Sequence, residues 1–424
     1  MLDIRTIRDD PERVRQGALK KRFPDRAAAV DRVLELDAQV RGLIPELDGL
    51  RNEQKQAGKQ MGKLDAAQRE VFLEQQRELK ARIQTLELKE RELQDALREQ
   101  LLLVPNVPDP EVPSGADDQA NVEVRRVGRI PQFSFPVKSH DEIAVARGWL
   151  DVERAARMAG SRNYMLFGEL ALLHDAVLRL AIDHMVGKGF VPVDPPLLVR
   201  DEVMTGTGFF PGGEEQTYRV PEDGLNLIGT AEVPVTSIHA DEILDPSELP
   251  KRYVARSACF RREAGTYGKD TKGLYRVHQF QKVEQVIIDV ADEARSRAHH
   301  EDIVRNSEEV LAALELPYRV VAVCGGDLGV PQAFKYDIEC WMPSRNNFGE
   351  THSASRFYDY QARRLKMRYR DAESRKVLHC HTLNNTVLAS PRILIPILEV
   401  HQQADGRVRV PAALRGYLGG RETL

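Results

Sequence analysis

Residues 27–103 carry an apolar repeat that commits this part of the chain to two long helices packed along a seam. Apolar residues recur at alternating spacings of three and four, and after a break a second series resumes seven residues apart. This spacing places them on one stripe of each helix. The first series is Val33, Leu36, Val40, Leu43, Leu47, Leu50 and Ala57, and the second is Phe72, Leu79, Leu86 and Leu93, with Ile83 and Leu97 beside it.

The break between the two series, GKQMGKLDAAQ at 58–68, holds two glycines and Asp65, which is suited to begin a helix. We therefore expect an antiparallel coiled-coil hairpin whose helices, each of roughly 35 residues, reach about 50 Å. Pro45 lies inside the first helix and is expected to kink it.

A stripe of positive charge approaches the tip of this hairpin. Its members, four residues apart, are Arg51, Lys55, Lys59 and Lys63. Like charges at that spacing repel, so the stripe does not serve helix stability, but it suits contact with a phosphate backbone. The alternative is the solvated outer face of a structural or dimerising rod.

After residue 103 the helical repeat ends and short strands alternate with helices. The whole chain is therefore predicted to be an α+β protein of two domains. Residues 104–124 contain four prolines and several acids and are expected to form a linker between a domain at 1–103 and one at 125–424. The second domain mixes short alternating strands with helices expected at about 141–158, 168–187 and 292–315.

Net charge, apolar runs and cysteine spacing limit the ligands, the location and the kinds of site that we expect. The net charge of −4, from 61 basic and 65 acidic residues, means that a nucleic-acid ligand would need a local basic patch. The N-terminus lacks a signal peptide and the longest apolar runs are too short to span a membrane, so we expect a cytoplasmic protein. The cysteines show no CxxC spacing and are expected to be free thiols: Cys259, Cys324, Cys340 and Cys380.

The stretch FRREAGTYGKDTKGLYRVHQFQKVE at 260–284 places unusual charge on a predicted strand pair, 253–262 and 274–290. If 274–290 is one strand, its even positions project from one face. That face would carry Arg276, His278, Phe280, Lys282 and Glu284. An ordinary amphipathic hairpin remains one interpretation, and a surface that binds a ligand is the other.

The residue types on that face suit a nucleotide beside a small amine. Arginine pairs bidentately with phosphate, phenylalanine offers a flat face to a purine, and glutamate can bind an ammonium or hydroxyl group. Neither a GxxxxGK[ST] loop nor a GxGxxG loop occurs in the sequence. Phosphate binding is therefore not expected to use a helix N-terminus of the P-loop kind.

These motifs resemble the seryl-tRNA synthetases among the class II aminoacyl-tRNA synthetases. The stretch 260–284 is similar to their motif 2 (about 253–290), GFVPVDPPLL at 189–198 to the dimer-forming motif 1 (about 180–200), and NNTVLASPRILIPILE at 384–399 to motif 3 (about 384–402). LIGTAEVP at 227–234 resembles their serine-pocket segment, and the similarity covers nearly the whole chain. The resemblance implies a mixed, mainly antiparallel sheet flanked by helices, and a homodimer.

It also implies an activity: L-serine is activated with ATP and Mg²⁺ to seryl-adenylate, then transferred to tRNA(Ser) and tRNA(Sec). Arg261 and Arg392 would be catalytic. Serine would contact Thr230, Ala231, Glu232, Arg261, Glu284, Asn384 and Thr386. ATP would contact Arg261, Arg262, Glu263, Val277, His278, Gln279, Phe280, Glu350, Thr351, His352, Ser353 and Arg392. Glu350 and Ser353 are the expected Mg²⁺ ligands, with Glu339 a weaker candidate, and Arg51, Lys55, Lys59 and Lys63 would contact tRNA.

Several residues depart from the commoner bacterial pattern. His352 replaces a frequent serine, Gly349 stands where a basic residue is usual, Val400 replaces a frequent asparagine, and NNTVLASPR replaces a glycine-rich form. All lie near the expected site without removing a charged ligand. Gly349 is expected to mark a turn.

Two other interpretations of the function stay open. One is a ligase that loads an amino acid onto a carrier protein, and the other is a coiled-coil scaffold with a degenerate nucleotide fold.

Two further segments are not expected to belong to the active site. His299 and His300 should lie on a solvated helix surface. QARRLKMRYR at 361–370 should be either a solvated edge strand or a surface that faces tRNA.

Overall fold

The computed structural model describes residues 1–60, 65–265 and 273–424. Lys63, the last member of the basic stripe, lies outside these residues. The chain divides into two compact units, one of residues 2–105 and one that comprises 106–424 with Met1.

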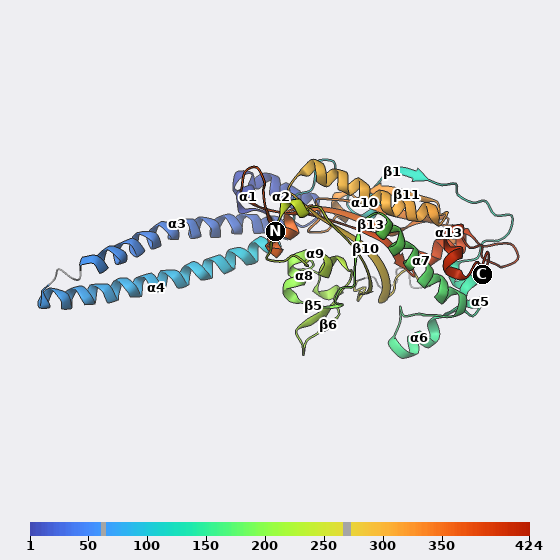
Figure 1. Ribbon diagram of the computed structural model, residues 1–424, viewed down its shortest axis with the longest axis horizontal. Helices are drawn as coiled ribbons and strands as arrows, with labels where there is room; N and C mark the ends of the chain where they lie inside the picture. The colour runs from blue at the N-terminus through green and yellow to red at the C-terminus, as the bar shows by residue number, and fades with distance from the viewer. Residues whose placement is uncertain (61–64, 266–272) are drawn as a thin grey trace. The chain divides into compact units, whose positions relative to one another are not determined.

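The first unit is helical. It consists of α1 (Ile4–Asp9), α2 (Pro11–Lys20), α3 (Pro24–Gln60) and α4 (Ala66–Leu103), and Figure 1 shows α3 and α4 running side by side. Asp65 begins α4 as expected, because its side chain accepts a hydrogen bond from the Gln68 backbone N–H and its own backbone N–H donates one to the Gln68 side-chain oxygen. Helix α3 continues through Pro45.

The predicted hairpin seam is confirmed by burial. Leu43, Leu47 and Ile83 form its buried core, and Leu50, Leu79, Leu86 and Leu93 pack against them. Ion pairs cross between the helices at Arg51–Glu87, 2.8 Å, and Arg82–Glu46, 2.9 Å. Both pairs join the middle parts of the two helices and add polar contacts beside the apolar seam.

The second unit is built on an eight-stranded sheet that confirms the expected mixed, mainly antiparallel type. Strand β4 pairs in parallel with β9, and every other neighbouring pair in the sheet is antiparallel. In spatial order the strands are β1 (Val122–Val127), β11 (Tyr318–Ala322), β12 (Phe334–Met342), β13 (Asn347–Tyr358), β16 (His381–Ser390), β10 (Gln279–Asp289), β9 (Lys251–Phe260) and β4 (Val191–Val193).

Side chains that alternate along the central strands serve two different faces. On β10, Val283 and Ile287 enter the main core with the long helices α7 (Gly168–Gly187) and α10 (Glu293–Ala313) and with α12 (Leu394–Val400). Val286 and Ile288 instead join a second cluster with α9 (Glu232–Thr236) and α11 (Tyr360–Leu365). Helix α8 (Asp201–Thr207) packs against both α9 and α11.

The remaining small elements lie outside the central sheet. One three-stranded sheet has the order β5 (Leu198–Arg200), β7 (Leu225–Leu227), β6 (Arg219–Val220). Another has the order β15 (Val377–His379), β14 (Arg368–Arg370), β8 (Ile243–Leu244), and α13 (Ala412–Arg415) lies near the end of the chain.

Helices α7 and α10 agree with the sequence predictions, but the helix expected at 141–158 is wrong. The structure has α5 (His140–Ala146) and α6 (Val152–Ala159), separated by β2 (Leu150–Asp151), which pairs with β3 (Met165–Leu166). Gly148 adopts a φ of 66°, which a continuing helix cannot accommodate, and the Asp151 side chain begins α6 by accepting from the Arg154 backbone.

The expected second strand, 274–290, is also too long, because β10 begins only at Gln279. Arg276 and His278 therefore precede the strand, and the single alternating face predicted from 276 to 284 starts at Phe280. The segment 361–370 is not the solvated edge strand that was one of its two expected forms, because α11 buries Gln361 and Arg364 and β14 is the middle strand of its sheet. The other form, a surface that faces tRNA, stays a prediction. Arg364 reaches inward to donate a hydrogen bond to the Phe210 carbonyl, 2.9 Å.

His299 and His300 are buried, which corrects the expectation of a solvated surface. The His299 ring lies 2.8 Å from Asp289, and His300 Nε2 lies 3.0 Å from the Ala354 carbonyl while its ring stacks on Tyr336. Adjacent helical residues point in different directions, but α10 packs against β10, β13 and β16, and both histidines find partners there.

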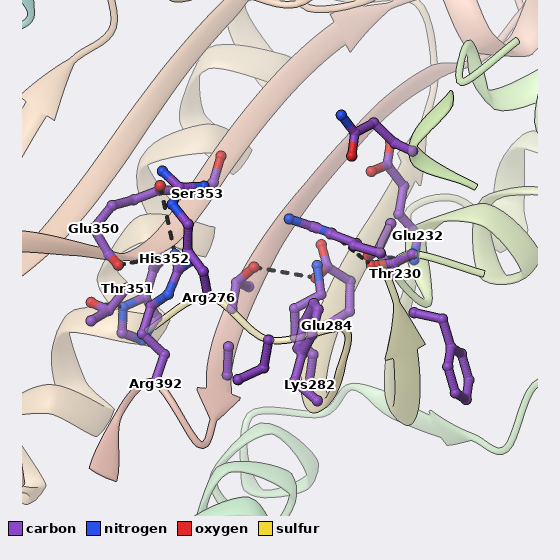
Figure 2. A pocket seen from close by; sticks show the side chains of 18 of the residues that line it. Thr230, Glu232, Arg276, Lys282, Glu284, Glu350, Thr351, His352, Ser353 and Arg392 are labelled. Carbon is purple, nitrogen blue, oxygen red and sulfur yellow. Dashed lines mark hydrogen bonds and ion pairs between the residues drawn. The ribbon is translucent and has the colours of Figure 1, made fainter. Parts of the chain in front are cut away.

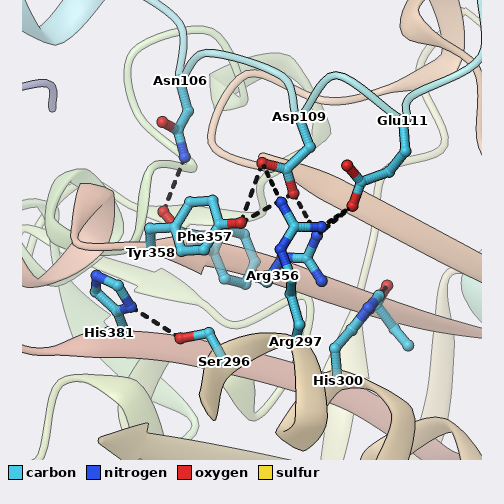
Figure 3. Close-up of polar contacts among 11 residues, drawn as sticks. Asn106, Asp109, Glu111, Ser296, Arg297, His300, Arg356, Phe357, Tyr358 and His381 are labelled. Carbon is cyan, nitrogen blue, oxygen red and sulfur yellow. Dashed lines mark hydrogen bonds and ion pairs between the residues drawn. The ribbon is translucent and has the colours of Figure 1, made fainter. Parts of the chain in front are cut away.

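The proline-rich segment after α4 is held against the second unit by a cluster of charges (Figure 3). The Asn106 side chain donates to the Phe357 carbonyl, 2.8 Å, and Asp109 pairs with the buried Arg356 and accepts from the Tyr358 hydroxyl, 3.0 Å. Glu111 lies 3.1 Å from Arg356. These contacts fix the first part of 104–124, and β1 begins within the expected linker, at Val122.

All four cysteines are buried and free, as predicted. Within 1–60, 65–265 and 273–424, no helix combines the length and the hydropathy that a membrane span requires.

We predict that Asp109→Asn lowers the free energy of unfolding of the second unit by about 2–3 kcal/mol, because it leaves Arg356 partly uncompensated in a buried place. Urea denaturation followed by tryptophan fluorescence measures the change, since both tryptophans, Trp149 and Trp341, lie in this unit. Asp405→Asn is the matched control, because Asp405 pairs with Arg407 on the surface. Equal effects of the two substitutions would contradict the prediction.

Candidate active site

A pocket of about 550 Å³ opens on the central sheet, over β10, β13 and β16. Figure 2 shows that its labelled side chains form two groups. Thr230, Glu232, Lys282 and Glu284 lie at one end, which we call the carboxylate end. Arg276, Glu350, Thr351, His352, Ser353 and Arg392 lie at the other, which we call the arginine end.

Most of the residues predicted from the sequence line this one pocket, although they come from segments far apart in the chain. They are Thr230, Glu232, Arg261, Glu263, Val277, Phe280, Glu284, Glu350, Thr351, His352, Ser353, Asn384, Thr386 and Arg392. Four others are not among its lining residues: Ala231 is buried in the cluster of α9 and α11, Arg262 and Gln279 are exposed, and His278 lies with Nδ1 2.9 Å from the Arg261 carbonyl.

Aromatic rings and backbone carbonyls position two arginines in the pocket. The Arg392 guanidinium lies 4.4 Å from the centre of the Tyr275 ring and donates to the Glu350 carbonyl, 3.2 Å. The Arg261 guanidinium lies 5.2 Å from the centre of the Phe280 ring, and its Nε donates to the Gly229 carbonyl, 3.3 Å. Stacking and fixed hydrogen bonds restrict both side chains before any ligand binds.

Two acidic side chains accompany the arginines. Glu350 is only partly shielded from water; that shielding would raise its pKa, but the positive charges of Arg392 and Lys335 outweigh it and hold this pKa below its ordinary value. Asp337 lies 3.1 Å from Lys335, and burial raises its pKa to about 7. Ser353 pairs with Asp337 in the sheet register.

These residues suit a magnesium ion that is held mainly by a nucleotide. Mg²⁺ usually takes one or two protein carboxylates and completes its shell with phosphate oxygens and water. Glu350 fits because its side chain is 46% exposed and lies no closer than 3.7 Å to Arg392, which leaves oxygen atoms free. Glu339, the weaker candidate, is turned toward Arg319, 2.6 Å, and does not line the pocket.

The departures at His352 and Gly349 have distinct physical consequences. His352 is buried between the Thr351 hydroxyl, 2.7 Å, and the Val387 carbonyl, 3.1 Å, and burial lowers its pKa to about 4, so the ring is neutral. Gly349 does not mark a turn, which corrects the prediction, because it lies inside β13. A Cβ there would come within 2.8 Å of the Met342 side chain.

The carboxylate end of the pocket contains two acids in different surroundings. Glu284, on β10, lies 2.6 Å from the Lys282 ammonium and 3.4 Å from the Thr386 hydroxyl. Glu232, at the start of α9, accepts from the Gln361 amide, 2.8 Å. Burial and the nearby Glu284 charge raise the pKa of Glu232 to about 7.

Sequence reasoning gave no role to several residues that line or support the pocket. Arg276 and Lys282 stood on the alternating face, so the pattern singled them out without a function. Lys335 and Gln361 carried no signal, because their positions depend on β12 lying beside β13 and on α11 folding under Glu232.

Two family models match the chain. The seryl-tRNA synthetase N-terminal domain matches residues 1–108, and the tRNA synthetase class II core domain (G, H, P, S and T) matches residues 217–401. A serine–tRNA ligase of Deinococcus radiodurans is 46% identical over 424 residues, covering 100% of this chain and 99% of the relative. The chain belongs to the seryl-tRNA synthetase family.

Solved structures of family members agree over the full length. A seryl-tRNA synthetase from Pyrococcus horikoshii, complexed with ATP, has a TM-score of 0.94 at 40% identity, covering 100% of this chain and 99% of that one. A cytoplasmic serine–tRNA ligase from Naegleria fowleri, in complex with AMP, has a TM-score of 0.88 at 32% identity, covering 100% and 98%. The expected α+β fold, with a helical arm and a class II catalytic domain, is therefore confirmed.

We predict that one glutamate in the pocket titrates near neutral pH. Glu232 is expected to change charge at about pH 7, because burial and Glu284 disfavour its ionised form. Carbon-13 NMR of side-chain carboxyls, recorded between pH 5 and pH 8.5, would show this titration, and Glu232→Gln would remove it. Glu373→Gln, on an exposed loop, is the control that should leave the signal in place. A spectrum in which all glutamates titrate below pH 5.5 would refute the assignment.

Proposed function

We propose that this chain activates L-serine with ATP, giving seryl-adenylate and pyrophosphate, and then transfers serine to the terminal adenosine of tRNA(Ser). The observation that carries the proposal is the two-ended pocket, in which a carboxylate end and an arginine end share one open sheet face. A small amino acid presents an ammonium and a hydroxyl to carboxylates, whereas a nucleoside triphosphate presents negative oxygens to guanidinium groups. Transfer to tRNA(Sec) stays a prediction.

In the first step, a serine carboxylate oxygen attacks the α-phosphorus of ATP, and the bond to the β-phosphate oxygen breaks as pyrophosphate leaves. The serine carboxylate is ionised at pH 7, so this step needs positioning and positive charge rather than a general base. We assign Arg261 to the α-phosphate and the serine carboxylate, and Arg392 to the γ-phosphate. Both line the pocket in fixed orientations.

Phe280 is proposed to stack on the adenine, with Val277 and Glu263 beside the nucleotide. Arg262, His278 and Gln279 lie next in the chain to lining residues and would border the nucleotide rather than enclose it. Mg²⁺, held by Glu350 and Ser353, would supply further positive charge to the phosphates. Thr351 and His352 support this edge of the site from β13.

Selectivity for serine is proposed to come from Glu284, Thr386, Glu232, Thr230 and Asn384, the lining residues of the carboxylate end, with Ala231 packed behind them. A site that hydrogen-bonds a substrate hydroxyl can reject the analogue that lacks it by roughly 10⁴–10⁵. Alanine would leave one of these buried polar groups without a partner. Threonine would have to be excluded by lack of space.

The coiled-coil hairpin is proposed to bind tRNA through shape and backbone contacts. Lys55 and Lys59 are exposed on α3 and available for phosphate. Arg51 is exposed but already pairs with Glu87, 2.8 Å, so its contribution to tRNA binding must compete with an ion pair inside the hairpin.

We further propose a cytoplasmic homodimer. Strand β4 occupies the edge of the sheet, and Val191 on β4 and Leu198 on β5 are exposed apolar side chains, as a surface that meets a second copy requires. The carrier-protein alternative is disfavoured by the full hairpin, which matches the N-terminal domain of the family. The scaffold alternative is disfavoured because Arg261, Glu284 and Arg392 all line the pocket.

The proposed function predicts ATP–pyrophosphate exchange that depends on serine and is far weaker with threonine, alanine or glycine. Arg261→Ala should lower the serine-dependent rate by roughly 10²–10³, the typical worth of one oriented donor at such a site. Arg368→Ala, which breaks an exposed pair with Asp241, is the control and should exchange normally.

Exchange that is equally fast with all four amino acids would refute the proposed substrate. Near-normal exchange in a folded Arg261→Ala protein would refute the role of that arginine.

Removal of residues 35–97 is predicted to spare exchange and abolish aminoacylation of tRNA, because the hairpin and the pocket belong to separate compact units. A finer variant, Lys55→Ala with Lys59→Ala, should raise the KM for tRNA and flatten its dependence on salt. Lys80→Ala with Lys89→Ala removes the same charge from α4 and serves as the control. Intact aminoacylation after the deletion would contradict this role of the hairpin.

A further inference from the structure

Lys282 is a buried cation in the carboxylate end of the pocket to which the proposed reaction gives no part. Its side chain is only 8% exposed, and its ammonium lies 2.6 Å from Glu284 Oε2. Lys282 and Glu284 are two residues apart on β10, so both point from the same face into the pocket. Burial of a lysine ammonium is unfavourable unless a partner compensates its charge, so the position of Lys282 indicates a specific role.

Lys282 lies near two carboxylates, and its charge offsets one of theirs. Two carboxylates, Glu232 and Glu284, approach one another closely enough for the second to raise the pKa of the first, whereas Lys282 lowers it. Gln361 also bonds Glu232, but a neutral amide cannot balance a charge. Once Glu232 has lost its proton, at about pH 7, two acids and one ammonium leave a single net negative charge, which matches one substrate ammonium group.

The other charged or titratable groups around the Lys282–Glu284 pair do not take over this task. Arg261 lines the same pocket and is directed toward Phe280 and the Gly229 carbonyl. Cys259 lies close to the pair, but burial raises the pKa of its thiol, so it stays neutral. Lys282 is therefore the cation in direct contact with the acid pair among the residues that the structure describes.

We propose that Lys282 is a positioning residue for the amino-acid substrate: its ammonium neutralises one of the two pocket carboxylates and fixes Glu284, so that the site presents one negative charge to one ammonium. This inference rests on the proposed activation of serine. Without Lys282, the ionised form of Glu232 loses a favourable nearby charge, so Glu232 keeps its proton to a higher pH, and that proton competes with the substrate ammonium.

The test compares three variants that separate charge, hydrogen bonding and packing: Lys282→Met, Lys282→Gln and Lys282→Arg. Serine-dependent ATP–pyrophosphate exchange is measured at pH 6.5, 7.5 and 8.5, with KM determined separately for serine and for ATP. At pH 7.5 we expect Lys282→Met to raise the KM for serine on the order of 10²-fold, as loss of one partner of a buried charge pair does, and to change the KM for ATP by less than about threefold.

Lys282→Gln should resemble Lys282→Met, because it keeps a donor but not the charge. Lys282→Arg should recover at least about tenfold of the loss, because it restores the charge. In the two uncharged variants, the KM for serine should fall as the pH rises to 8.5, by more than in the unaltered protein, because higher pH removes this proton from Glu232.

Lys251→Met is the matched control, since Lys251 forms a lysine–glutamate pair with Glu248 on β9 outside the pocket, 2.8 Å, and should leave both KM values unchanged. The inference would be overturned by equal increases in both KM values, by Lys282→Arg being no better than Lys282→Met, or by a pH profile that does not move. If Lys282→Met does not fold, Lys282→Gln and Lys282→Arg still decide between charge and packing. Absence of serine-dependent exchange in the unaltered protein would instead refute the proposed function itself.

Discussion

The alternation of side chains along β10 is the constraint on which the site depends. One face of this strand supplies Val283 and Ile287 to the core beneath α7 and α10, and the other supplies Phe280, Lys282 and Glu284 to the pocket. A core that holds the strand rigid therefore also holds the charged groups at fixed spacing, which is what electrostatic catalysis requires. The free-energy cost of burying charged groups on this face is kept low, because each buried charge meets an opposite charge or a hydrogen-bond donor.

Much of this organisation could be predicted from the sequence, because it follows from short-range periodicity. The seam residues of the hairpin and the Asp65 helix start are local patterns, and burial confirms them. The charged face of β10 was visible for the same reason, from Phe280 onward. Resemblance to a known family then brought Thr230, Arg261 and Arg392 to the same site, which no local pattern could do.

What could not be predicted depends on contacts between distant segments. In the sequence, His299 and His300 resemble surface residues. In the fold, α10 packs against the sheet, and the two rings contact Asp289 and the Ala354 carbonyl. Gln361 acquires its place only because α11 lies beneath Glu232. The end of α5 at Ala146 is the exception, since the glycine at 148 is a local signal in the sequence that the apolar pattern on either side concealed.

Gly349 links the interior of β13 to the arginine end of the pocket. The space that a side chain there would occupy is filled by Met342 and bordered by Tyr275, the ring on which Arg392 rests. Any side chain at 349 therefore requires the end of the flexible Met342 side chain to move aside. A side chain at 349 would also press on the Tyr275 ring against which Arg392 stacks, so a change inside β13 reaches the arginine end of the pocket through that ring.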